Sequence, residues 1–220
     1  MTPMVRRARH VRVLVFGASG GTGRELVTQA LAQGRQVTAF VRNPARLSVQ
    51  SSELRLAQGD VTDMAAVERA IQGQDAVLCA LGAASPLRRD RTLIEGVQHI
   101  VDAMTRYGTR RLVYLSFLGV LQGRAQLSFI GRTVVAPLLL RNVVADHEAK
   151  ERIIQQSGLE WVIVRPPRLT NGPRRGTFRH GLEIRATSMI PTISRADIAD
   201  FMLRQIDDDR YVHRPTAIMY

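Results

Sequence analysis

The chain has 220 residues, of which 45% are hydrophobic, and this is enough to bury the core of one α/β domain. It contains no stretch of about twenty apolar residues, so no membrane-spanning helix is expected. The formal net charge of +12 would suit nucleic acid, an acidic membrane surface or an anionic small molecule. The arginines are spread along the chain without interleaved aromatic residues, which argues against a nucleic-acid-binding surface. We therefore expect a soluble domain that acts on a small molecule, with no nucleic acid and no membrane as partner.

The first ten residues are basic, but the apolar run that follows them extends only from Val11 to Phe16. Such a run is too short for a signal peptide, so residues 1–10 are interpreted as an N-terminal extension and residues 11–220 as the domain. Cys79 is the only cysteine, which excludes an intramolecular disulfide and a thiolate metal site. Its neighbours are those of a buried strand, so it is interpreted as an inert core thiol. These observations favour a cytoplasmic protein with no metal site.

Short apolar runs alternate with segments of helical period along the chain. The runs predict six strands, at residues 11–17, 36–41, 54–58, 75–81, 112–117 and 161–165. The segments between them predict helices, one ending at Gly34 and another before Gly108, and Ser194 with Asp197 resembles a capping box at the start of the last. This alternation predicts a Rossmann-type doubly wound parallel sheet in a single α/β domain, with a small C-terminal part that covers the substrate.

The segment from Leu127 to Val144 is strongly hydrophobic and is interrupted by Arg132, Pro137 and Arg141. These interruptions argue against a bilayer span. Three interpretations remain open, namely a packed insertion helix, a hydrophobic lid over a flat substrate, and an oligomer contact.

A glycine-rich turn follows the first predicted strand and opens the first helix, which is the context in which such a turn binds a dinucleotide. Gly17 allows the sharp turn, Gly20 lets backbone N–H groups approach the pyrophosphate, and Gly23 lets the helix pack closely on the strand. The start of the helix then faces the anion. The predicted coenzyme contacts of this turn are Gly17, Ser19, Gly20, Gly21, Thr22 and Gly23.

The residue at the end of the second strand indicates which coenzyme is bound. An acidic residue there would bind the ribose hydroxyls of NAD and repel a 2′-phosphate, but this chain has Arg42. Arg46 follows one helical turn or a short loop later, so two guanidinium groups are available to hold the phosphate. The sequence therefore favours NADP(H) over NAD(H).

Further short motifs, in this order along almost the whole chain, resemble those of the atypical short-chain dehydrogenases/reductases. Besides the glycine turn they are Val41-Arg42-Asn43 with Arg46, Gly59-Asp60-Val61, Ala80-Leu81-Gly82, Asp146-His147, Ser157-Gly158-Leu159, Arg165-Pro166-Pro167 and Ile193-Ser194-Arg195-Ala196-Asp197. Within that superfamily the chain most resembles the NADPH-dependent flavin reductase/biliverdin-IXβ reductase group and its NmrA-like relatives.

The resemblance implies roles for individual residues. Asp60 and Val61 border the adenine, and Ser116 lies beside the nicotinamide, near the carboxyl end of the fifth predicted strand where open α/β sheets bind ligands. The remaining implied coenzyme contacts are Leu81, Gly82, Ala83 and Pro167. His147 is implied to approach the coenzyme or substrate, which makes it a catalytic candidate together with Ser116. The candidate substrate contacts are Phe117, His147 and Arg168.

Two departures from these relatives bear on the reaction. Ordinary short-chain dehydrogenases place a tyrosine four residues before a lysine, but here Asp146 stands four residues before Lys150, so a Tyr–Lys mechanism on a ketone is unsupported. The flavin and biliverdin-IXβ reductases have histidine after the paired prolines, where this chain has Arg168.

The leading hypothesis is hydride transfer from NADPH to a flat conjugated acceptor such as a free flavin, with linear tetrapyrroles or quinones as further candidates. Such acceptors delocalise the added charge and ask less of a positioned acid, so stacking over the nicotinamide supplies much of the catalysis. An alternative is an NADP(H)-sensing, NmrA-like regulator that binds a protein partner without turnover. A third is an epimerase or other short-chain reductase with a different proton donor. The sequence does not predict an oligomeric state.

Overall fold

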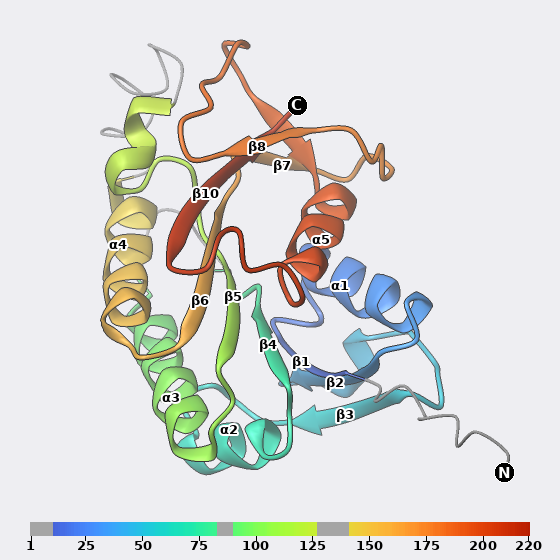
Figure 1. Ribbon diagram of the computed structural model, residues 1–220. Helices are drawn as coiled ribbons and strands as arrows, with labels where there is room; N and C mark the ends of the chain where they lie inside the picture. The colour runs from blue at the N-terminus through green and yellow to red at the C-terminus, as the bar shows by residue number, and fades with distance from the viewer. Residues whose placement is uncertain (1–10, 83–89, 127–140) are drawn as a thin grey trace, which may run out of the picture.

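The computed structural model describes residues 11–82, 90–126 and 141–220, and its main feature is an eight-stranded sheet (Figure 1). The strands of this sheet are β1 (Arg12–Phe16), β2 (Gln36–Val41), β3 (Leu54–Gln58), β4 (Ala76–Cys79), β5 (Arg111–Leu115), β6 (Glu160–Arg165), β8 (Arg179–Gly181) and β10 (Arg214–Met219). Their spatial order is β3-β2-β1-β4-β5-β6-β10-β8, and every neighbouring pair is parallel except β10 with β8. The order of the first six strands is that of the Rossmann fold, which confirms the predicted fold class.

Helices cover both faces of the sheet (Figure 1). They are α1 (Gly21–Ala32), α2 (Met64–Ile71), α3 (Arg91–Tyr107), α4 (Arg141–Gln156) and α5 (Arg195–Arg204), and short 3₁₀ turns occupy Pro44–Arg46 and Leu121–Gln126. One core lies between the sheet and α1 with α5, and a second lies between the sheet and α2, α3 and α4. Strand β1 shows why two cores form, because its side chains alternate between them: Val13 and Val15 lie in the first, and Leu14 and Phe16 lie in the second.

The predicted strands agree with the structure at their centres. Strands β2 and β3 have the predicted bounds, whereas β1, β4, β5 and β6 differ by one or two residues at their ends. Four strands of the C-terminal part were not predicted: β8, β10, β7 (Arg168–Thr170) and β9 (Thr192–Ser194), the last two forming a separate parallel pair. The three-residue strands are too short to carry a pattern, and β10 opens with polar residues that hide its apolar end.

Two of the predicted helix ends are confirmed. Gly34 follows α1 with φ of +73° and Gly108 follows α3 with φ of +72°, and in each case the left-handed conformation stops the helix where glycine is tolerated. The predicted capping box of α5 is half formed. Ser194 Oγ accepts from the Asp197 N–H at 3.0 Å, but the Ser194 N–H donates to the Tyr220 hydroxyl instead of the Asp197 carboxylate.

The carboxylate of Asp197 ties the C-terminal part together. It is fully buried and accepts hydrogen bonds from the hydroxyl of Tyr220 at 2.5 Å, the N–H of Gly176 at 2.8 Å and the hydroxyl of Ser194 at 3.0 Å. These bonds join the start of α5 to the loop after β7 and to the last residue of the chain. They hold the C-terminal part against the main sheet.

Of the hydrophobic segment from Leu127 to Val144, residues 127–140 lie outside the described residues, and residues 141–144 form the first turn of α4. The N-terminal extension, residues 1–10, also lies outside them. None of the described helices is both long and apolar enough to cross a membrane.

Candidate functional site

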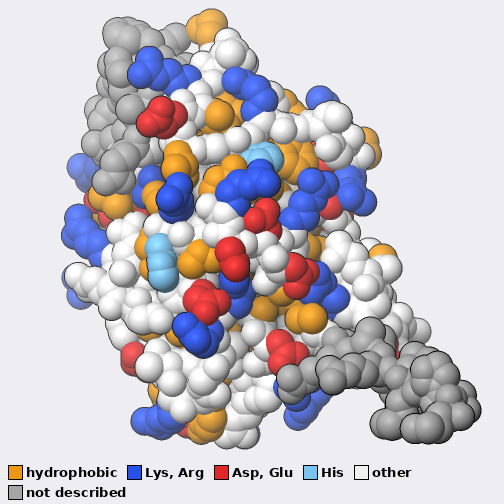
Figure 2. Space-filling view, viewed as in Figure 1, with side chains coloured by type: hydrophobic (Ala, Val, Ile, Leu, Met, Phe, Trp, Pro, Cys, Tyr) orange, Lys and Arg blue, Asp and Glu red, His pale blue; other side chains and the backbone are white. Residues whose placement is uncertain are grey.

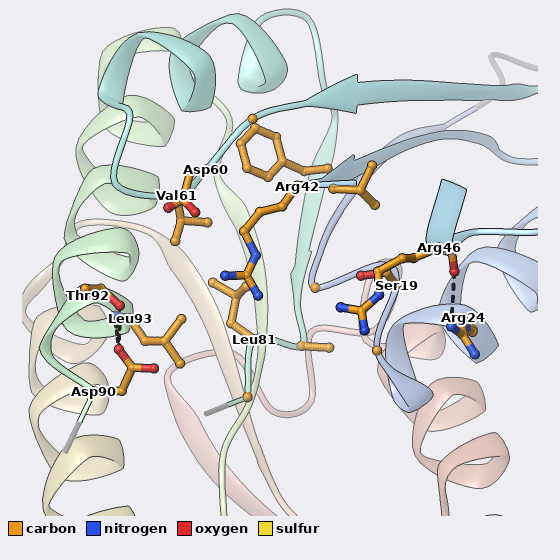
Figure 3. Close-up of a pocket in the computed structure, with 17 residues that line it drawn as sticks. Ser19, Arg24, Arg42, Arg46, Asp60, Val61, Leu81, Asp90, Thr92 and Leu93 are labelled. Atoms are coloured by element: carbon orange, nitrogen blue, oxygen red, sulfur yellow. Dashed lines mark hydrogen bonds between the residues drawn. The ribbon is translucent and has the colours of Figure 1, made fainter. Parts of the chain in front are cut away.

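A cavity of about 370 Å³ lies at the carboxyl ends of β1, β2 and β4, beside the starts of α1 and α3 (Figure 3). This volume is within the range of small-molecule sites. The residues predicted to bind the coenzyme that line it are Gly17, Ser19, Gly20, Arg42, Arg46, Asp60, Val61, Leu81 and Gly82. The fold thus brings these predicted residues together in one cavity, although they are up to 65 positions apart in sequence, counted from Gly17 to Gly82.

At Gly17 and Gly23, two positions where the sequence predicted that glycine is needed, the structure leaves no room for a side chain. Gly17 has φ of +77°, and a Cβ there would lie 2.5 Å from the carbonyl oxygen of Ala80. A Cβ on Gly23 would lie 2.0 Å from the carbonyl oxygen of Gly17, so α1 packs against the turn only because residue 23 is glycine. The Gly20 N–H donates to the Gly17 carbonyl at 2.9 Å and closes the turn.

The start of α1 is open to an anion. Its N-cap is Gly20, no side chain of the described residues caps it, and its first turn carries no acidic residue. Backbone N–H groups at such a terminus and the helix dipole together attract phosphate. The side chain of Arg195 from α5 adds a positive charge here, since a Cβ on Gly21 would lie 2.7 Å from its Cδ and Nε atoms. Its Nη1 donates to Asn171 Oδ1 at 2.6 Å.

Three arginines surround the other end of the cavity. Arg42 follows β2, Arg46 ends the short 3₁₀ turn after it, and Arg24 comes from α1. Arg24 Nη2 donates to the Arg46 carbonyl oxygen at 3.1 Å, and Asn43 Oδ1 caps the 3₁₀ turn by accepting from the N–H of Ala45 at 3.0 Å. Figure 3 shows Arg42 and Arg46 directed into the cavity. Arg24 was not predicted, because only tertiary packing brings α1 beside this turn.

Asp60 and Val61 lie across the cavity from Arg42 (Figure 3). The backbone N–H and the hydroxyl of Thr62 both donate to Asp60 Oδ1, at 3.0 and 2.9 Å, and these bonds together with the charge of Arg42 hold the pKa of Asp60 below its usual value. The carbonyl oxygen of Val61 is hydrogen-bonded to His99 Nδ1 at 2.9 Å. This wall of the cavity therefore presents a fixed carboxylate beside an apolar surface.

The predicted catalytic Ser116 lies just beyond the carboxyl end of β5 and is buried. Its hydroxyl donates to Glu151 Oε1 at 2.5 Å, and Glu151 is also paired with Arg165, whose Nε donates to the same oxygen at 3.0 Å. Both charged side chains are almost fully buried. The Ser116 proton is thus directed to Glu151, while the oxygen keeps the capacity to accept a hydrogen bond.

The predicted catalytic His147 is half-buried on α4, and its Nδ1 lies 3.1 Å from the hydroxyl of Tyr114 on β5. Burial, with a smaller effect from the positive charge of Lys150, lowers the pKa of His147 to about 3, so the imidazole is neutral at physiological pH. Lys150 is itself buried, and burial lowers its pKa. Sequence reasoning missed Tyr114, because its apolar neighbours on β5 predicted only a core position.

The remaining predicted site residues differ in their burial. Phe117 is half-buried with its ring folded over Gly119, where a Cβ would lie 2.4 Å from the Phe117 Cε1 atom. Pro167 is buried and Arg168 is exposed at the start of β7. Ala83 lies outside the described residues. The predicted inert thiol Cys79 is buried in the second core, and burial raises its pKa to about 11.

Sequence comparison agrees with this geometry. A profile described as NAD(P)H-binding matches residues 17–209 of the chain. The chain therefore belongs to the NAD(P)H-binding family, and it shares its fold with a solved short-chain dehydrogenase/reductase.

Particular relatives and solved structures extend the comparison. The (4-alkanoyl-5-oxo-2,5-dihydrofuran-3-yl)methyl phosphate reductase of Streptomyces griseus is 32% identical over 154 residues, and the match covers 70% of this chain and 46%, about half, of that protein. The anaerobillin reductase ChuY of Escherichia coli O157:H7 has a TM-score of 0.76 at 20% identity, covering 94% of this chain and 96% of that one. A short-chain dehydrogenase/reductase of Veillonella parvula, solved in complex with NADP, has a TM-score of 0.79 at 16% identity, covering 95% and 94%. At these identities the solved structures show a shared fold.

Proposed function

We propose that this protein is an NADPH-dependent reductase that transfers hydride to a flat conjugated acceptor, with a free flavin as the leading candidate and a linear tetrapyrrole or quinone as further candidates. The observation that carries the proposal is the cavity itself. It joins a helix start that no described side chain caps, and which would therefore accept a phosphate, to three arginines and an apolar wall. This is the arrangement that a phosphorylated dinucleotide requires.

The preference for NADPH rests on Arg42 and Arg46, which lie where an acidic residue would select NAD. Both guanidinium groups are exposed and directed into the cavity, so they are free to hold a 2′-phosphate with two-pronged hydrogen bonds (Figure 3). Arg24 adds a third positive charge at the same end. The carboxylate of Asp60 lies within reach of the Arg42 charge, and Asp60 and Val61 would border the adenine.

When bound, NADPH supplies the hydride, and the protein's own residues position the acceptor. The Ser116 oxygen would be available to accept a hydrogen bond from the nicotinamide amide, because its own proton is donated to Glu151. Phe117 follows Ser116 just beyond the end of β5, and His147 contacts Tyr114 from α4, so these two side chains would border the acceptor. The exposed Arg168 attracts a propionate or phosphate of the acceptor. Pro167, buried just after β6, would be a further coenzyme contact.

Reductase activity is also consistent with the relatives. The Streptomyces griseus protein is named as a reductase of a furanone phosphate, and ChuY as an anaerobillin reductase. Both names describe a reductase.

A second candidate function is that of an NADP(H) sensor that binds a protein partner without turnover. Two observations favour it. Asp146 stands where ordinary short-chain dehydrogenases place their catalytic tyrosine, and its carboxylate accepts a hydrogen bond from the N–H of Asp90 at 2.7 Å. The proton of Ser116 is held by a buried carboxylate.

The test is a spectrophotometric assay of NADPH and, separately, NADH oxidation by the purified protein with FMN, riboflavin, a quinone and biliverdin as acceptors. The reductase predicts turnover with NADPH preferred. Absence of turnover with every acceptor at saturation, combined with tight NADPH binding, would refute the reductase and support the sensor.

A further inference from the structure

His147 and Tyr114 form a polar contact across the face where α4 covers β5. Tyr114 and Ser116 are two positions apart on the chain, so both side chains leave β5 on the same face, toward α4. His147 and Glu151 are four positions apart on α4 and therefore share one face of that helix. Two contacts result, Ser116 with Glu151 at 2.5 Å and Tyr114 with His147 at 3.1 Å. The His147 ring thus lies one helical turn from the group that holds Ser116.

The direction of the Tyr114 hydrogen bond follows from burial. Tyr114 is fully buried, and burial raises the pKa of its phenol well above the usual value, so the hydroxyl keeps its proton. Among the described residues, this hydroxyl makes the bond to His147 Nδ1 and no other. A buried O–H left without an acceptor is costly. Tyr114 therefore donates, and Nδ1 accepts.

A neutral imidazole has one N–H donor and one acceptor nitrogen. Because Nδ1 is the acceptor, the ring proton is on Nε2. We propose that Tyr114 is a positioning residue that holds His147 in this tautomer, so that Nε2–H donates a hydrogen bond to a carbonyl oxygen or ring nitrogen of the bound acceptor. This proposal rests on the proposed reductase function, and it adds a requirement on the substrate class.

The requirement is that the acceptor presents a hydrogen-bond-accepting atom to His147. A flavin, a bilin lactam and a quinone each carry such an atom, whereas a conjugated hydrocarbon does not. A neutral His147 binds and polarises this atom by donating a hydrogen bond, and it does not act as an imidazolium acid. The burial and the nearby Lys150 charge that keep the ring neutral therefore suit this role.

The tautomer is measured directly by nitrogen NMR of uniformly labelled protein, with His147 assigned from the spectrum of His147→Gln. The chain has five histidines, which keeps the spectrum simple. The parent is expected to show a proton on Nε2 and none on Nδ1. In Tyr114→Phe, which removes only the hydroxyl, a measurable share of the Nδ1–H tautomer is expected. A proton on Nδ1 in the parent, or identical ring signals in Tyr114→Phe, would overturn the proposal.

Steady-state kinetics tests the consequence for catalysis. Loss of one hydrogen bond predicts a fall in kcat of about fivefold in Tyr114→Phe, with the KM for NADPH unchanged. The matched control is Tyr211→Phe, because the buried Tyr211 hydroxyl lies 2.8 Å from Nδ1 of the half-buried His180 in a second tyrosine–histidine pair. Tyr211→Phe is expected to leave kcat unchanged. Equal losses in the two variants would assign the Tyr114 effect to stability and overturn the proposal.

Failure of the proposed function is distinguishable from failure of this inference. If none of the acceptors supports NADPH oxidation by the parent protein, the reductase proposal fails. The nitrogen spectrum still decides which ring nitrogen of His147 is protonated. Conversely, turnover by the parent together with an Nδ1–H tautomer retains the reductase and rejects the role of Tyr114.

Discussion

Replacement of Arg42 by alanine tests the assignment of the coenzyme phosphate. A hydrogen bond to a charged group contributes about 1.5–3 kcal/mol, and the lower end applies to Arg42 because its side chain is exposed to solvent. A loss of about 1.5 kcal/mol corresponds to an increase of about tenfold in the Kd for NADPH. NADH lacks the 2′-phosphate, so its Kd is expected to change by less than about twofold.

The assay is fluorescence titration of both coenzymes at low and high ionic strength. The preference for NADPH is expected to shrink as salt rises, since exposed charges are screened. Arg46→Ala is expected to weaken NADPH binding similarly. The double variant is expected to lose less binding free energy than the two single variants added together, because both side chains hold the same phosphate. Arg55→Ala, an exposed arginine at the opposite, amino end of the strands, removes the same charge and serves as control. An equal loss of affinity for NADH and NADPH in Arg42→Ala would refute the reasoning.

Three further predictions concern stability and the glycine turn. Gly23→Ala is expected to abolish coenzyme binding and lower the Tm, because its Cβ would lie 2.0 Å from the rigid Gly17 carbonyl, whereas Gly158→Ala meets no atom within 4 Å and should be neutral in thermal melts. Glu151→Leu is expected to cost about 3–5 kcal/mol in urea unfolding, because it leaves its arginine partner buried without a counter-charge. Asp197→Asn is expected to lower the free energy of unfolding at neutral pH. In this variant the free energy of unfolding should also fall less steeply as the pH is lowered, which unfolding measured at several pH values will show.

The sign of the Asp197 effect follows from its surroundings. Burial raises the pKa of this carboxyl, but hydrogen bonds from the Tyr220 hydroxyl, two backbone N–H groups and the Ser194 hydroxyl outweigh burial and lower it below the usual value. The stabilisation is therefore present above the unfolded pKa of about 3.9 and is lost as the pH falls through the folded value. An acid transition in Asp197→Asn identical to that of the parent would contradict this account.

The chain also offers a control for Glu151→Leu. Glu148→Gln removes a partly exposed carboxylate on the same helix as Glu151, 4.0 Å from the exposed Arg152, and is expected to change stability by less than about 0.5 kcal/mol. Comparable losses in Glu148→Gln and Glu151→Leu would reject the special cost of the buried pair. Normal NADPH binding by Gly23→Ala would show that α1 tolerates a shift away from the turn.

The local features of the coenzyme site could be predicted from sequence. The glycine turn is visible because glycine is needed at a positive φ and at a close approach, and both needs arise within seven residues, from Gly17 to Gly23. Arg42 follows a strand whose bounds were predicted correctly. The alternation of apolar runs with helical segments likewise predicts the Rossmann order.

The contacts around Ser116 and His147 could not be predicted in this way. Their partners, Glu151 and Tyr114, are separated from them by 35 and 33 positions, and the contacts depend on how α4 settles on β5. The side chain of Arg195 packs against Gly21. This contact joins α5 to α1, which lie near opposite ends of the chain. No local pattern encodes such pairs.

The sequence by itself determined the class of fold and the position of the glycine turn, and it predicted the two arginines proposed to favour NADPH, because each depends on the conformation or charge of a few neighbouring residues. The tertiary structure decided which groups face one another at the end of β5: the proton of Ser116 on Glu151, and the hydroxyl of Tyr114 on His147. Strand order and helix packing set those distances, and they result from the burial of the whole core, to which every element contributes.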